Sequence, residues 1–259
     1  MNPASRLLAI YDNLVSSNEE QPMVRVWARV FDFNYDKATI EDDLTACLIG
    51  LRGEIDYARL RLSEHGVPLE LTDPGFMRLK DVAAPARLHT GWNSLRGNVQ
   101  PPECRQAFLW GAWILREEDE DVMPGDDMQG LKAELEALEV GLKDAAMSPF
   151  LREFVQKQVD AIRAALRLYA VQGSRPLHDA LHTVAGAWTV SGARVEAESA
   201  KATPEAKSVV ARAAQAIRKT AEVCDSLDKI RKAGEGAWSL ATTVGPLVLP
   251  YIAKQIGNS

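Results

Sequence analysis

An apolar stripe with helical spacing runs between Thr39 and Gly66, and it limits the fold more than any other feature of this sequence. Its members follow one another at alternating steps of four and three residues, the repeat of one helix face: Leu44, Leu48, Leu51, Ile55, Ala58 and Leu62. The acids at 41–43 suit the positive end of a helix dipole and predict Thr39 as the N-cap. A long helix with one apolar face must bury that face against neighbouring elements.

The same pattern recurs along the chain and predicts about eight helices. Several of them begin with a capping residue followed by proline, the arrangement expected at helix N-termini. The further predicted helices start at Asn2, Met23, Pro102, Met128, Ser148, Ser174 and Thr203, and the last of them reaches Lys232. Patterns with strand spacing are short, and they fit a helix face equally well. The predicted fold class is therefore all-α, a multi-helix bundle.

An acidic run at 116–127, "REEDEDVMPGDD", is the best candidate for a boundary inside the chain. Its charges repel one another, and the Pro-Gly pair at 124–125 breaks any helix through it. We predict two packed helical subdomains, 1–121 and 127–259. The first is rich in tryptophan and includes an irregular connection over 66–101, in which we expect only short helices. The acids from Glu117 to Asp121 read as a solvated helix end.

Composition excludes several classes of function. The chain has 259 residues and a net charge of −6 at pH 7, with Lys and Arg interspersed among acids, which argues against a nucleic-acid partner. Its three cysteines have neither zinc-ligand nor redox spacing. The first residues lack the pattern of a secretory signal. These features predict a cytoplasmic protein with reduced thiols and no cofactor.

One stretch resembles catalytic chemistry. In "HDALH", His178 and His182 lie one helical turn apart with Asp179 between them, close to the H-E-x-x-H zinc signature. A metal-dependent hydrolase would use the histidines as ligands and Asp179 as general base. That side chain is short, and no third ligand is fixed, because a loop is expected near Gly192. Each histidine follows a stripe position by one residue, so we interpret them as structural residues at the border of a buried face and predict no metal site.

An uncharged segment at 236–253, "GAWSLATTVGPLVLPYIA", is the second informative stretch. As a helix it would span roughly 27 Å, marginal for a membrane core, and two prolines interrupt it. It can be core, a partner surface or a membrane-contacting segment. The residues that we predict to contact a partner or membrane are Trp238, Leu240, Val244, Leu247, Leu249, Tyr251 and Ile252.

Together these features predict a non-catalytic, cytoplasmic interaction or regulatory protein. Its C-terminal helices would bind a protein partner or a second copy. The first alternative is a helical effector, of the toxin or bacterial defence type, that acts on the inner face of a membrane after a trigger. The second alternative is the hydrolase at HDALH.

Overall fold

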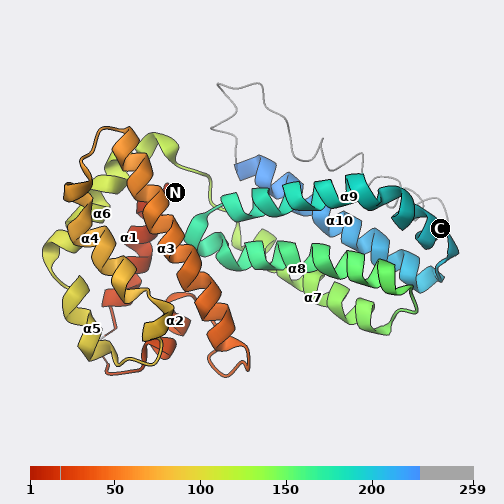
Figure 1. The fold of residues 1–259 in the computed structure, drawn as a ribbon, viewed down its shortest axis with the longest axis horizontal. Coiled ribbons are helices and arrows are strands. Elements are labelled where there is room, and N and C mark those ends of the chain that lie inside the picture. The colour runs from red at the N-terminus through yellow and green to blue at the C-terminus, as the bar shows by residue number, and fades with distance from the viewer. Residues whose placement is uncertain (18, 228–259) are drawn as a thin grey trace. The chain divides into compact units, whose positions relative to one another are not determined.

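The computed structural model describes residues 1–17 and 19–227. This part of the chain contains ten α-helices, two short 3₁₀ helices and no strand (Figure 1). The predicted all-α fold is confirmed. The chain forms two compact units, which we describe separately. Unit 1 comprises Met1–Glu120 and Ala170–Gly173, and unit 2 comprises Asp121–Tyr169 and Ser174–Ser259.

Unit 1 is built on four packed helices, α1, α3, α4 and α6. The helix α6 packs against α1 and α4, and α3 packs against α1, α2 and α4 (Figure 1). Its helices are α1 (Pro3–Val15), α2 (Met23–Val30), α3 (Ile40–Glu64), α4 (Leu69–Val82), α5 (Trp92–Val99) and α6 (Pro102–Ile114), with 3₁₀ turns at Pro85–Arg87 and Arg116–Glu118. Two of the ten helices, α4 and α5, therefore lie in the connection that was expected to be irregular.

The helix α3 buries its whole predicted stripe. All six residues from Leu44 to Leu62 named above are at most 1% exposed. Gly66 follows the helix with φ +79°, a left-handed conformation that suits glycine at a helix end. Thr39 precedes the first turn but caps no backbone N–H; its hydroxyl instead donates to Asp43 Oδ2 at 3.2 Å. Thr39 is therefore the N-cap residue, as predicted, although its side chain does not cap the helix.

The helix α1 begins as predicted. Asn2 is the N-cap, and its Oδ1 accepts from the backbone N of Ser5 at 2.9 Å. The buried face carries Tyr11, whose hydroxyl donates to the Val99 carbonyl at 2.6 Å. The Tyr11 ring lies 5.3 Å from that of Phe108 on α6. These contacts place α1 and α6 side by side in the core of unit 1.

Proline and glycine shape the contact between α4 and α6. Pro74 lies inside α4, which is why local sequence signals favoured an interrupted connection there. A Cβ on Gly75 would lie 2.7 Å from the Cys104 carbonyl oxygen and 2.8 Å from the Ala107 side chain. Only a residue without a side chain allows this approach. Arg78, further along α4, meets Glu103 at 3.3 Å, so the two helices run antiparallel.

Unit 2 contains long helices that lie side by side (Figure 1). They are α7 (Gly125–Asp144), α8 (Pro149–Gln172, whose last three residues belong to unit 1), α9 (Arg175–Lys201) and α10 (Pro204–Leu227). The hydroxyls of Ser148 and Thr203 cap α8 and α10, each accepting a backbone N–H at 3.3 Å. Leucine, valine and alanine side chains from all four helices form one buried cluster.

The loop expected near Gly192 is absent, because α9 runs unbroken from Arg175 to Lys201. Leu177, Leu181, Val184 and Trp188 are buried as predicted, and Val195 continues the same stripe beyond the glycine. The burial of Trp188 before Gly192 and of Val195 after it offsets the cost of about 1 kcal/mol that a glycine imposes on a helix interior. The predicted end of the last helix, at Lys232, lies outside the described residues.

Candidate functional site

The HDALH histidines occupy one edge of α9. His178 is half-buried, whereas His182 and Asp179 are exposed. The Thr183 hydroxyl donates to the Asp179 carbonyl at 2.9 Å, an ordinary contact within a helix. This is the border position that the sequence predicted for the two imidazoles.

A third metal ligand is not brought to this pair by α9. Because the helix is continuous, Glu196 lies roughly 21 Å along its axis from His182, at 1.5 Å per residue. Over 1–17 and 19–227, no group of three or more His, Cys, Asp or Glu side chains is placed to hold a metal ion. The described part of the chain thus offers the hydrolase alternative no complete ligand set.

The C-terminal contact residues predicted above, from Trp238 to Ile252, lie outside the described residues. The partner surface and the membrane contact assigned to them stay predictions. Among the helices that the structure describes, none is both long and apolar enough to cross a membrane.

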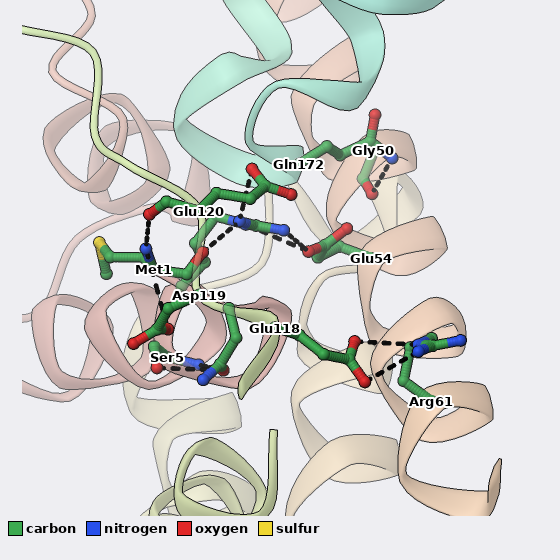
Figure 2. A network of polar contacts seen from close by, with 11 residues as sticks. Met1, Ser5, Gly50, Glu54, Arg61, Glu118, Asp119, Glu120 and Gln172 are labelled. Carbon is green, nitrogen blue, oxygen red and sulfur yellow. Dashed lines mark hydrogen bonds and ion pairs between the residues drawn. The ribbon is translucent and has the colours of Figure 1, made fainter. Parts of the chain in front are cut away.

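The acidic run after α6 is only in part the solvated helix end that we expected. Glu117, Asp119 and Asp121 are exposed, but Glu118 and Glu120 are half-buried. Glu118 turns inward, where Arg61 on α3 approaches it with Nε and Nη2, each 2.9 Å from a carboxylate oxygen (Figure 2). His65 Nε2 lies 2.8 Å from Glu118 Oε1. Partial burial raises the pKa of Glu118, whereas the hydrogen bonds from Arg61 and His65 lower it. The lowering is the larger effect, so the pKa of Glu118 lies below its ordinary value.

A second cluster brings Met1, Glu54 and Glu120 together in the same part of unit 1 (Figure 2). It surrounds Arg6 of α1. The side chain of Arg6 is 6% exposed and meets the fully buried Glu54 of α3, with Nη2 at 2.8 Å from Oε1. Its Nη1 donates to the Met1 carbonyl at 2.8 Å and lies 3.4 Å from Glu120 Oε2. Buried arginine and glutamate are tolerated only when they are paired in this way.

The residues Ala170–Gly173 are held at the same place. Gln172 Nε2 donates to the Gly50 carbonyl on α3 at 3.1 Å. Gly173 has φ +66°, and a Cβ there would press on the Glu120 carboxylate and lie 2.6 Å from Arg6 Nη1. Cations and carboxylates therefore neutralise one another across this cluster, and its evident role is to anchor two chain segments.

Two neighbouring hollows, of about 550 and 390 Å³, lie in unit 2 at the turns before α8 and α10. Both are lined by Met147 and Arg152. The guanidinium of Arg152 is already engaged, because it caps α7 through the Leu142 and Ala145 carbonyls. In the larger hollow, Lys157 and Glu153 pair at 2.7 Å. These charged groups are thus occupied within the chain.

The outward side of α6 is the most unusual surface of unit 1. Trp110 and Trp113 are 63% and 67% exposed, whereas Trp27 and Trp92 in the same unit are buried. On the opposite side of α6, Ala107, Phe108 and Gly111 are buried and Ile114 is half-buried; Leu115, which follows the helix, is also buried. Exposed tryptophan is costly in water and is typical of contact surfaces.

We define the α6 face as the exposed residues Glu103, Gln106, Trp110, Trp113 and Arg116. The first four are spaced by three, four and three residues and so share one side of the helix. No charged residue occurs between Gln106 and Leu115. Arg116 lies 4.5 Å from the centre of the Trp113 ring, which fixes that indole in place. The face is thus aromatic in the middle and charged at its two ends.

Sequence reasoning named neither tryptophan as a site residue. The signal was nevertheless present, because both fall opposite the apolar stripe of their own helix. No protein-family model, curated protein or solved structure matches this chain.

Proposed function

We propose that this chain is a non-catalytic helical interaction protein that binds a protein partner through the α6 face. The observation that carries the proposal is the exposure of two neighbouring tryptophans on one helix side. Tryptophan and arginine are the residue types that contribute most to binding energy at protein interfaces. A surface with Trp110, Trp113 and Arg116 in adjacent turns matches that composition.

The charged clusters of unit 1 agree with a binding role. The carboxylates of Glu54, Glu118 and Glu120 are each paired with arginine. A general acid or base needs a group able to exchange a proton with a substrate, and these groups instead hold the scaffold. A rigid scaffold beneath an exposed aromatic surface is what a protein-binding helix requires.

The test is site-specific photo-crosslinking in cells of the source organism. A photoreactive phenylalanine analogue replaces Trp110, and the control places it at Leu60, which is 55% exposed on α3 of the same unit. We expect crosslinks to an identified protein from position 110 and none from position 60. The purified partner should then bind Trp110→Glu at least tenfold more weakly than the unmodified chain, a change of about 1.4 kcal/mol. Equal products from both positions would refute the proposal.

A further inference from the structure

We infer that the partner of the α6 face is the same face of a second copy, paired antiparallel about a twofold axis. This inference rests on the binding role proposed above and identifies the partner. It is carried by the order of charges along the helix. Glu103 lies near the start of α6, Arg116 lies just after its end, and the residues of the α6 face between them, Gln106, Trp110 and Trp113, are uncharged.

An antiparallel pair brings opposite charges together at both ends. When Glu103 of one copy faces Arg116 of the other, the axis passes beside Trp110, midway between them in sequence. Each Trp113 then faces Gln106 of the second copy. A parallel pair would instead oppose Glu103 to Glu103 and Arg116 to Arg116, which is unfavourable. The charge order therefore selects one orientation.

Both terminal charges are accessible to a second copy. The side chain of Glu103 is 54% exposed and pairs only loosely with Arg78, at 3.3 Å. The side chain of Arg116 is 51% exposed and lies 3.4 Å from Glu117. Across a twofold axis, charged groups at the rim set the orientation, and desolvated aromatic groups at the centre supply the affinity.

The exposed area sets the strength of the expected pairing. Side chains of aromatic residues bury about 150–250 Å² each, so the two tryptophans offer roughly 300 Å² per copy. A stable dimer buries about 800 Å² per partner. We therefore expect a weak dimer that forms at tens of micromolar.

The experiment is sedimentation velocity on the full chain, from about 5 to about 200 µM. The weight-average sedimentation coefficient of the unmodified chain should rise over this range. Glu103→Arg alone and Arg116→Glu alone should each stay monomeric, because like charges then meet at both ends. An equimolar mixture of the two variants should associate again, since every end of the mixed dimer carries opposite charges. Circular dichroism checks that each variant keeps its helical content.

Two further variants separate the face from the rest of unit 1. Trp110→Glu should abolish association, and Leu60→Glu, at an exposed apolar site on α3, should leave it unchanged. An unmodified chain that stays monomeric at all concentrations would overturn the inference, as would folded single variants whose mixture fails to associate. Crosslinks from position 110 to a different protein would, in that event, leave the proposed function standing while the twofold pairing falls.

Discussion

At the scale of single residues, the acidic run at 117–121 shows how side-chain direction decides what a charge does. The side chain of Glu117 is 80% exposed, whereas those of Glu118 and Glu120 are 20% and 25% exposed. The two inward carboxylates meet arginines from α1 and α3. In this short segment the side chain of Glu117 is therefore hydrated, whereas those of Glu118 and Glu120 are held in ion pairs.

Replacing Glu118 tests how much its ion pair with Arg61 stabilises the fold, because that contribution depends on pH. Its pKa in the folded chain lies below the ordinary value, so its stabilising contribution is present above the unfolded pKa and is lost as the pH falls through the folded one. Glu118→Gln should lower the free energy of unfolding by about 1 kcal/mol at neutral pH. The deficit should shrink as the pH falls below the ordinary pKa of glutamate, as measured by urea unfolding. Glu117→Gln is the control, and a deficit that is independent of pH would contradict the assignment.

The pairing of Arg6 with Glu54 marks the limit of sequence reasoning at this scale. The two residues are 48 positions apart, and periodicity informs only about neighbours within a few turns of one helix. Their meeting depends on how α1 packs on α3, and no local pattern encodes that register. The inward turn of Glu118 and Glu120 was missed for the same reason.

At the scale of elements, the approach of α4 to α6 depends on Gly75. Gly75→Ala would force its Cβ against the Cys104 carbonyl and the Ala107 side chain. The helices would have to separate, which should lower the free energy of unfolding by about 1–3 kcal/mol.

The matched control is Gly97→Ala in α5, where an added Cβ meets nothing within 4 Å. That change should be neutral or slightly stabilising, because alanine reduces the entropy of the unfolded chain. Thermal unfolding of both variants provides the measurement. Equal destabilisation by the two would show that helix propensity and not close packing matters at position 75.

Helices were predictable where a stripe, a cap and a stop agreed. The helix α3 carries six buried stripe residues and is followed by Gly66, so its periodicity was sufficient. Only short helices were expected where the 14-residue α4 lies, because Pro74 is a local break signal, yet the neighbouring residues Thr72 and Phe76 are buried. Gly192 in α9 is a second local break signal, and it led to the wrong prediction of a loop there. In both helices tertiary burial outweighs a local signal.

At the scale of the whole molecule, the last three residues of α8 and the glycine that follows them belong to unit 1. Ala170–Gly173 are held by Gly50 and by the Arg6 cluster. The sequence indicated a boundary near the acidic run, but no pattern showed that a second segment returns to unit 1. Such an exchange depends on long-range contacts.

Glu54→Gln tests this assignment, because it leaves the buried Arg6 without its full counter-charge. Removing one partner of a buried pair costs about 3–5 kcal/mol. Amide hydrogen exchange should therefore accelerate throughout 1–120 and also in 170–173, while 149–169 keep their protection. Asp12→Asn, in the exposed pair with Arg105, is the control and should cost less than about 1 kcal/mol. Unchanged exchange at 170–173 would contradict the unit assignment.

Because some tryptophan side chains of this chain are exposed and the others are buried, tryptophan fluorescence can report on the exposed ones. Of the tryptophans in the described residues, 27, 92 and 188 are at most 2% exposed, and only 110 and 113 face water. In a Trp238→Phe background, collisional quenching by acrylamide should therefore read out those two side chains. Whatever covers them would shift the emission to the blue, without any attached label.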